Sequence, residues 1–370
     1  MQSERLKLLA VGDIILGPNP EFYFLPSKSV LKTADILYGQ LEVPYTNRDA
    51  DAVALGRSPD VLKALVDSGF HIVSLAGNHL LDAGAPGVED TIDWLKKHNI
   101  AYVGAGLNIE EAKRHVIIER DSTRFGFLDY NCVGPKETWA TSVKPGNAYL
   151  NIITHYELDH ATPGGPPAIY TWAEPVTLNA MSNDIRKLRP MCDVLIISFH
   201  KGLGHTPVKL AAYERQVSYA AVDAGADIVL GHHAHILKGI EFYKGKPIYH
   251  SLCNFVAYVP SLAAKPGQDA QSWAVRRKEL FGFEPDPEYP TYPFHPEAIY
   301  TIIAKCTIES KKLSRISYLP CIVNKKGQPE IVKNDSEGKR VFDYMNKITR
   351  GAGLNVRYRW NKDEVLCEEQ

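Results

Sequence analysis

The stretch ADIVLGHHAH, residues 226–235, places three histidines within four positions at the end of a short apolar run. The run Ile228–Leu230 is typical of the end of a buried strand. Imidazole is the commonest metal ligand in proteins, but it also serves as a proton shuttle or as an ordinary hydrogen-bonded core residue. Which role applies here depends on whether other strands bring metal-binding side chains to the same place.

The sequence around this stretch alternates short apolar runs with helical patterns through the first 255 of its 370 residues. Such alternation predicts an α/β fold in which helices cover β-sheets. Helices are expected to begin at Ser58-Pro59, at Pro86 and at Pro207, because proline favours the first turn of a helix. The apolar runs predict strands at Leu6–Val11, Ile36–Leu41, His71–Leu75, Val116–Ile118, Phe125–Tyr130, Val194–Ser198 and Ile228–Leu230.

Two regions interrupt the alternation. Residues 131–180 are rich in Pro, Gly, Trp and Tyr and are expected to form a long loop, and residues 259–298 form a second insert rich in proline and aromatic residues. Because long loops in compact domains are usually functional, we expect the second insert to be an ordered lid. The C-terminal segment 299–370 is predicted to contain strands, a turn at Asn324–Gly327 and a closing helix, Glu337–Thr349. We predict a single domain over residues 1–370.

Composition excludes several classes of protein. The formal net charge is -1 and no block of Lys and Arg is present, which argues against nucleic-acid binding. No apolar run approaches the roughly 18 residues that a membrane-spanning helix needs, and the N-terminal residues lack the features of a signal peptide. The six cysteines are scattered without a CxxC pair, which is typical of reduced thiols. These observations predict a cytoplasmic protein without a membrane partner.

Side chains that bind divalent metals follow five of the predicted strands. Because ligands of α/β sheets bind at the carboxyl ends of strands, these side chains are expected to lie close together. Taken singly, Asp13 is more often a turn residue and Asn78 a helix cap. Because carboxylate, amide and imidazole groups follow five strands at once, the combination predicts a bridged pair of zinc, manganese or iron ions. The strand-end residues are Asp13, Glu42, Asn78, His79, Asp82, His200 and the three histidines of GHHAH.

The order of these motifs resembles the CapA-type family, which is named for poly-gamma-glutamate capsule synthesis and belongs to the calcineurin-like metallophosphoesterase superfamily. The motifs are GD at 12–13, LEVP at 41–44, GNHLLDAG at 77–84, a strand ending in His200, and GHHAH at 231–235. GNHLLDAG and GHHAH are the specific ones, and similar segments cover most of residues 6–257 and the strands that follow. The resemblance implies a four-layer α-β-β-α sandwich with the metals at one edge.

The resemblance also implies a role for each side chain. His79, oriented by Asp82, is the implied catalytic imidazole. His233 and His235 are preferred to His232, which remains an alternative ligand, because alternate residues of an extended segment point the same way. The implied ligands are Asp13 and His235 for the first metal, Asn78, His200 and His233 for the second, and Glu42 as the bridge between them. The candidates for substrate contact are Arg57, Lys201 and Asn254.

The chain departs from the superfamily pattern at three places. Asp13-Ile14-Ile15 stands where the superfamily has Asp-x-His, so one ligand of the first metal is missing. Lys201 and Gly204-His205 replace the usual Trp and acidic residue, and Cys253 replaces a glycine. The missing histidine counts against a phosphatase, whereas the positive charge of Lys201 suits an anionic substrate.

These observations favour a metal-dependent hydrolase that uses one or two divalent ions and a metal-activated water on a small amide, lactam, ester or γ-glutamyl substrate. The alternatives are a phosphoesterase and a non-catalytic accessory protein of poly-gamma-glutamate synthesis. The presence of His79 with Asp82 favours an enzyme, and the lack of an N-terminal membrane anchor counts against the accessory role. The expected partner is a small, anionic molecule, and no particular oligomeric state is predicted.

Overall fold

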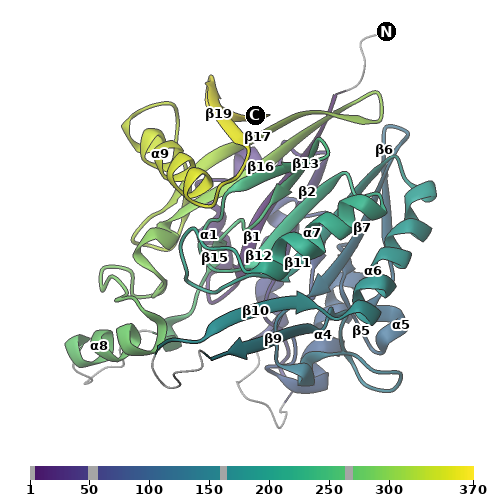
Figure 1. Ribbon diagram of the computed structural model, residues 1–370, viewed down its shortest axis with the longest axis horizontal. Helices are drawn as coiled ribbons and strands as arrows, with labels where there is room; N and C mark the ends of the chain where they lie inside the picture. The colour runs from purple at the N-terminus through teal and green to yellow at the C-terminus, as the bar shows by residue number, and fades with distance from the viewer. Residues whose placement is uncertain (1–4, 49–56, 159–164, 263–269) are drawn as a thin grey trace.

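Two β-sheets lie face to face at the centre of the molecule in the computed structural model, which describes residues 5–48, 57–158, 165–262 and 270–370 (Figure 1). The larger sheet has ten strands, in the order β19-β20-β17-β16-β1-β2-β3-β4, with β15 paired to β1 and β18 paired to β17. Its strands are β1 (Arg5–Ile15), β2 (Ile36–Leu41), β3 (Ile72–Ser74), β4 (Ala101–Val103), β15 (Asn254–Ala257), β16 (Tyr300–Glu309), β17 (Lys312–Val323), β18 (Pro329–Ile331), β19 (Val356–Asn361) and β20 (Glu364–Glu369).

The smaller sheet has six strands, in the order β13-β14-β12-β11-β7-β6. Its strands are β6 (Val116–Arg120), β7 (Thr123–Asn131), β11 (Val194–Lys201), β12 (Ile228–His233), β13 (Ile240–Tyr243) and β14 (Lys246–Tyr249). Two short strand pairs lie outside both sheets: β5 (Ala105–Gly106) with β8 (Gly146–Asn147), and β9 (Ile152–Glu157) with β10 (Ala168–Ala173).

Helices cover the outer faces of the two sheets. The helices are α1 (Pro20–Phe24), α2 (Lys28–Leu31), α3 (Lys63–Ser68), α4 (Gly84–Lys97), α5 (Ile109–Ala112), α6 (Pro175–Leu188), α7 (Ala212–Ala224), α8 (Ala270–Phe281) and α9 (Ser336–Gly351). Short 3-10 turns are η1 (Pro59–Leu62), η2 (Lys136–Thr138), η3 (Arg189–Met191), η4 (Pro260–Leu262) and η5 (Pro296–Ile299). Figure 1 shows α6 and α7 against the smaller sheet and α9 beside the C-terminal strands.

The central strands are apolar on both faces because each sheet is buried on both sides. In β1, Leu8 belongs to the core between the sheets, whereas Leu9 packs with helices α1 to α4. In β11, Ile196 belongs to the core between the sheets, whereas Ile197 packs with α6 and α7. This alternation builds three apolar layers between four layers of secondary structure. It confirms the predicted α-β-β-α sandwich, while the prediction of a single domain stays a prediction.

The predicted helix starts differ in their outcome. The start at Ser58-Pro59 is confirmed, because the Ser58 side chain accepts a hydrogen bond from the Asp60 backbone N–H at the beginning of η1. Helix α4 begins at Gly84, two residues before Pro86. The start at Pro207 is wrong, since α7 begins at Ala212. There the Glu214 carboxylate accepts a hydrogen bond from the Ala211 backbone N–H, and this cap fixes the start of the helix.

The long loop expected over residues 131–180 is wrong in part. The segment contains the β9–β10 hairpin and the first turns of α6, which begins at Pro175. Most hairpin side chains are exposed or only half-buried, so the hairpin lacks the apolar pattern of a core strand. The insert at 259–298 contains η4, η5 and α8, with residues 263–269 outside the described part. Strands at 299–332 and the turn at Asn324–Gly327 are confirmed, but β19 and β20 follow the helix that was expected to close the chain.

Candidate metal centre

The carboxyl ends of strands from both sheets meet at one edge of the sandwich. β1, β2 and β3 run parallel in the larger sheet, and β7, β11 and β12 run parallel in the smaller one. β1 contacts β12 across the two sheets. Within the larger sheet, Asp13 of β1 lies beside Asn254 of β15, and the Asp13 backbone N–H donates to the Cys253 carbonyl over 2.9 Å. Parallel strands deliver their terminal side chains to a common edge, as the sequence predicts.

Glycine precedes the polar residues in both motifs because there is no space for a side chain. A Cβ on Gly12 would lie 1.9 Å from the Cys253 carbonyl oxygen, and one on Gly231 would lie 2.1 Å from the His250 carbonyl oxygen. The segment after Gly231 leaves the regular strand, since His233 and His235 have φ angles of +87° and +50°. Such backbone conformations are costly and cluster at functional sites. The segment is therefore not extended, as the choice of His233 and His235 assumed, although both rings reach the site.

Asp13, Glu42 and His235 form a buried group that could hold a metal ion. One ligand atom from each lies within 4.8 Å of the other two. His235 Nε2 lies 3.2 Å from Glu42 Oε1, and His235 Nδ1 lies 3.6 Å from Asp13 Oδ2. Asp13 and Glu42 are 0% and 1% exposed, so water does not screen their charges. Two carboxylates buried side by side are stable only with positive charge between them.

The hydrogen bonding of this group fits a cation. Within the described part of the chain, neither carboxylate oxygen of Glu42 has a hydrogen-bond partner, and Asp13 Oδ1 also has none. Burial, followed by the charge of Glu42, raises the pKa of Asp13. Burial also disfavours the charged form of Glu42, but the charge of His235 outweighs it and lowers the pKa of Glu42 to about 2. Conversely, Glu42 outweighs the effect of burial on His235 and raises its pKa to about 9. The charges of His235 and Glu42 thus stabilise each other.

A chain of hydrogen bonds fixes the orientation of the His235 ring and which of its nitrogens carries the lone pair. The Tyr292 hydroxyl donates to the Ala298 carbonyl over 2.8 Å and accepts from Asn254 Nδ2 over 3.1 Å. This leaves Asn254 Oδ1 facing His235 Nδ1 at 2.7 Å, so Nδ1 donates the hydrogen bond. In the neutral ring the lone pair then lies on Nε2, the nitrogen beside Glu42. Partners of this kind orient metal-binding histidines and tune their basicity.

We expect Tyr292→Phe to weaken metal binding about tenfold, because Asn254 loses the partner that fixes its amide, and such outer contacts contribute 10- to 100-fold to metal affinity. Titration of metal-free protein against a competing chelator measures the change. Tyr289→Phe in the same insert is the control, since no hydrogen bond of the Tyr289 hydroxyl is found among the described residues. Equal metal affinity in the two variants would contradict the role given to this chain of bonds.

A second group of donor atoms lies beside the first. His200 Nε2 is 2.7 Å from Asn78 Oδ1, 3.2 Å from His233 Nδ1 and 4.0 Å from Glu42 Oε1. His200 is fully buried, and burial followed by the nearby histidines holds its pKa well below the usual range. The structure therefore brings together all six side chains that the sequence analysis names as metal ligands, with Glu42 between the two groups.

His79 and Asp82 form a pair at the edge of these groups. His79 Nδ1 lies 2.7 Å from Asp82 Oδ2, and their side chains are 42% and 30% exposed. Burial lowers the pKa of His79, but the hydrogen bond to Asp82 and the charge of Glu42 outweigh it, and the net pKa is raised. Since Asp82 engages Nδ1, the other ring nitrogen remains available for proton exchange.

His232, the alternative ligand, lies beside Oδ1 of Asp13, whereas His235 lies beside Oδ2. Its Nδ1 is 3.5 Å from Asp13 Oδ1, and its ring lies 6.0 Å from the ring of Tyr38. The side chain is fully buried, and neither ring nitrogen has a hydrogen-bond partner among the residues that the structure describes. His232 therefore contacts a residue of the first group but is not one of its three members.

The three candidates for substrate contact have different surroundings. Arg57 lines the cavity described below. Asn254 is fully buried and bonded to His235 and Tyr292, which makes it a positioning residue instead of a substrate contact. Lys201 is also fully buried, with Nζ 3.7 Å from Glu214 and 3.2 Å from His250 Nδ1. Because neighbouring residues of a strand point to opposite faces, Lys201 turns away from the site that His200 enters.

His205 is a residue whose place the sequence does not indicate. Its ring stacks on that of His235 with 5.4 Å between centroids and lies 4.9 Å from the ring of Phe283. The backbone N–H of His205 donates to the Ala234 carbonyl over 2.8 Å. Burial and the neighbouring histidines lower its pKa to about 2, so the ring is neutral. The sequence shows it only as a departure from a family pattern, since its contacts depend on the fold of a distant insert.

A cavity of 410 Å³ opens beside the buried groups. Glu42, His79, Asp82 and His235 line it together with Arg57, so two carboxylates, two imidazoles and one guanidinium share one space. The remaining lining residues are Ile15, Val43, Pro44, Ala83, Val259, Ser261, Leu262 and Phe294. Its size is in the range of small-molecule sites.

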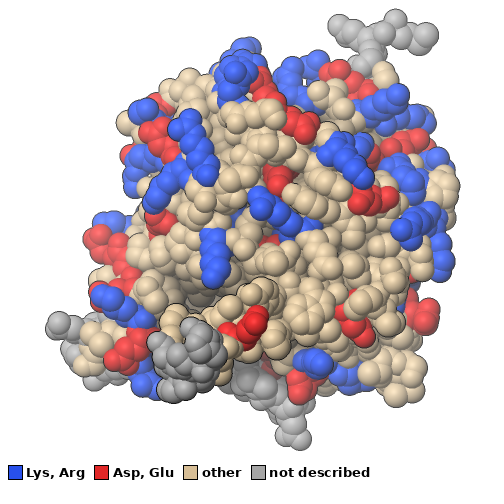
Figure 2. Space-filling view, in the orientation of Figure 1, with Lys and Arg blue, Asp and Glu red and all other residues tan. Residues whose placement is uncertain are grey.

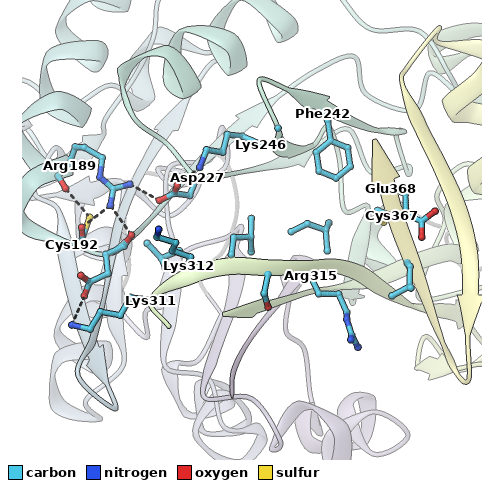
Figure 3. A pocket seen from close by; sticks show the side chains of 17 residues that line it. Arg189, Cys192, Asp227, Phe242, Lys246, Lys311, Lys312, Arg315, Cys367 and Glu368 are labelled. Atoms are coloured by element: carbon cyan, nitrogen blue, oxygen red, sulfur yellow. Dashed lines mark hydrogen bonds and ion pairs between the residues drawn. The ribbon is translucent and has the colours of Figure 1, made fainter. Parts of the chain in front are cut away.

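A larger cavity, of 870 Å³, involves the amino-terminal ends of β11 and β12 (Figure 3). Ion pairs occupy much of its lining: Arg189 and Lys246 both bind Asp227, and Lys311 lies 3.7 Å from Asp193. These contacts link elements of the sandwich. On the face seen in Figure 2, basic and acidic side chains are interspersed, so this face presents no continuous basic track.

Within the described ranges, no helix combines the length and the apolar character needed to cross a membrane.

Comparison with known proteins agrees with the motifs. Residues 7–259 match the sequence model of the family described as bacterial capsule synthesis protein PGA_cap. The chain is 28% identical over 271 residues to the capsule biosynthesis protein CapA of Bacillus anthracis, a match covering 69% of this chain and 60% of that protein. It is 28% identical over 264 residues to the PGA biosynthesis protein CapA of Bacillus subtilis, covering 66% of this chain and 62% of that protein. The chain thus aligns with about three fifths of the length of these relatives.

A solved structure shares the fold. The chain resembles a structure described as a novel phosphatase from Mycoplasma pneumoniae with a TM-score of 0.52 and 11% identity. The alignment covers 93% of this chain and all of the other. At this identity the likeness concerns the fold alone.

Proposed function

The chain belongs to the PGA_cap family of bacterial capsule synthesis proteins, and we propose that it is a metal-dependent hydrolase of a small amide, lactam, ester or γ-glutamyl compound. One observation carries the proposal. The buried group of Asp13, Glu42 and His235 adjoins the His79–Asp82 pair, and both contribute to one cavity. A site that only binds metal for structure has no need of an oriented, half-exposed imidazole beside it.

The donor set suits one or two divalent ions. Asp13, Glu42 and His235 would hold the first ion, and Asn78, His200 and His233 would share Glu42 to hold the second. Carboxylate, amide and imidazole ligands together favour zinc, manganese or iron over magnesium or calcium. A divalent ion bound here supplies Lewis-acid polarisation of the substrate oxygen and acidifies water.

The chain's own residues supply the proton transfer and the orientation. Asp82 accepts the hydrogen of His79 Nδ1 and so fixes the ring. The Nε2 atom of His79 then protonates the nitrogen or oxygen that leaves the substrate, as a general acid does. Asn254 holds His235, which in turn faces Glu42.

The cavity favours cleavage of an amide or a carboxylic ester over cleavage of a phosphoester. Ile15 stands where the superfamily pattern has a histidine and forms part of the cavity wall, so three side chains of the described residues would serve the first ion. Apart from histidines, Arg57 is the sole basic residue among the described residues that line the cavity. A dianionic phosphate ester gains from cationic side chains in addition to metal ions, and the described part of this wall offers Arg57 for that purpose.

Turnover by metal-reconstituted protein tests the proposal. Protein stripped with a chelator is loaded with zinc, manganese or iron and assayed with aryl amides, aryl esters, γ-glutamyl anilides and aryl phosphates. We expect metal-dependent cleavage of an amide or ester. Faster cleavage of the phosphate would establish the phosphoesterase alternative. Bound metal without any turnover would instead support the accessory role in poly-gamma-glutamate synthesis. Absence of bound metal would overturn both the hydrolase proposal and the phosphoesterase alternative.

A further inference from the structure

The cavity beside the metal centre has one cationic end. Arg57 Nη1 donates to the backbone carbonyls of Leu16 and Tyr258 over 2.7 and 3.1 Å. Both acceptors are neutral, so they fix the guanidinium without cancelling its charge. No carboxylate lies within ion-pair distance of Arg57 in the described part of the chain. Among the described residues no partner of Nε or Nη2 is found, and the edge that these two atoms form matches a carboxylate through two parallel hydrogen bonds.

The remainder of the cavity wall is mainly apolar. Val259, Leu262 and Phe294 come from the insert 259–298, and Val43 and Pro44 come from the segment after β2. The Phe294 ring lies 5.2 Å from that of His235, so this wall reaches the metal centre. Leu262 is 40% exposed, which places it at the rim. An apolar group that enters the cavity would cover this surface and gain the free energy of its burial.

We infer that the substrate is a small monoanion with an apolar body, of which an N-acyl amino acid is the simplest example. Its carboxylate binds the free edge of Arg57, and its apolar group packs on Val259, Leu262 and Phe294. The bond to be cleaved then lies near Glu42, His79 and His235. A polymer with a carboxylate on every residue fits less well, because the described residues of the cavity wall offer one cationic group besides the histidines. This inference rests on the proposed hydrolase function and adds the class of substrate.

Ligand-induced thermal shifts of the metal-loaded protein test the inference with three probes. These are N-benzoylglycine, its neutral carboxamide, and N-acetylglycine, which lacks the large apolar group. We expect N-benzoylglycine to bind about tenfold or more tightly than either of the others, since one charge-assisted pair or a few buried carbons each contribute at least this factor.

Two variants separate the ends of the cavity. Arg57→Gln keeps amide donors for the two carbonyls, and we expect it to lose the preference for the acid over the carboxamide. Leu262→Ser at the rim is expected to reduce the preference for benzoyl over acetyl and to keep that for the acid. Arg48→Gln is the matched control, because Arg48 is paired with Glu89 and Asp90 and does not line the cavity.

Equal binding of the acid and the carboxamide would overturn the inference, as would tighter binding of poly-γ-glutamate than of N-benzoylglycine. So would an unchanged preference in both variants. If the expected binding pattern appears but no amide or ester is cleaved, the substrate-class inference holds and the hydrolase proposal fails. The two proposals therefore fail separately.

Discussion

Asp13→Asn is expected to make the metal-free protein at least as stable as the unaltered chain, while removing most of the stabilisation that metal provides. In the metal-free chain Asp13 is fully buried beside Glu42, and burial and this neighbour raise its pKa. A carboxyl whose pKa is raised by folding destabilises the fold once it ionises, so the charge of Asp13 costs stability at neutral pH. Asparagine removes that charge and keeps an acceptor for the His233 backbone N–H.

The effect reverses when metal is present. A ligand that binds only the folded state stabilises it by about 2.7 kcal/mol at one hundred times its dissociation constant. Asp13→Asn replaces a charged ligand with a neutral one, and most of this gain should be lost. Thermal unfolding with and without added zinc or manganese measures both effects. On acidification the stability advantage of the metal-free variant should shrink, because Asp13 of the unaltered chain becomes protonated.

Asp227→Asn provides the matched control. Hydrogen bonds from Lys246, the Leu195 backbone and Arg189 outweigh burial and lower the pKa of Asp227, so its charge stabilises the fold at neutral pH. That variant should be less stable to the same extent with and without metal. If Asp13→Asn behaved in the same way, Asp13 would be a structural carboxylate and not a metal ligand.

The sequence predicts the layers and the edge of the sandwich because buried strands and strand-end donors have local signatures. β2 begins and ends where the apolar run Ile36–Leu41 does, and β1 and β11 extend beyond their runs because polar residues such as Asp13 and His200 continue them. Hydrophobic periodicity cannot detect a polar residue that is buried for function. The predicted ends of β1 and β11 are therefore wrong at the site itself.

Contacts between distant segments could not be predicted. Lys201 was expected at the substrate, yet its amino group lies between Glu214 and His250, which approach it only through the packing of α7 and β14. Asn254 was expected to contact substrate, yet Tyr292 from the following insert holds it against His235. A lysine or an asparagine suits either a substrate contact or a structural role, and only the tertiary packing shows which role Lys201 and Asn254 have.

His79→Ala is expected to lower turnover by about 100- to 10,000-fold, the usual contribution of a general acid or base, while metal content stays unchanged. The expectation follows from geometry. His79 lines the cavity beside Glu42 and His235, but its Nδ1 is engaged by Asp82 and it is not part of the buried metal-binding group. Steady-state kinetics on the amide or ester identified by the screen, with metal analysis of the same preparation, measure both quantities.

Asp82→Asn should lower turnover less and shift its pH dependence. Since the hydrogen bond to Asp82 raises the pKa of His79, the variant should lose the protonated ring at lower pH, and the alkaline limb of the profile should move toward acid. His115→Ala, at an exposed histidine away from the cavity, is the control and should leave kinetics unchanged. Loss of metal in His79→Ala would make this residue a ligand, and full turnover with metal retained would remove it from the reaction. Only loss of turnover with retained metal agrees with an imidazole that Asp82 holds ready to protonate a leaving group.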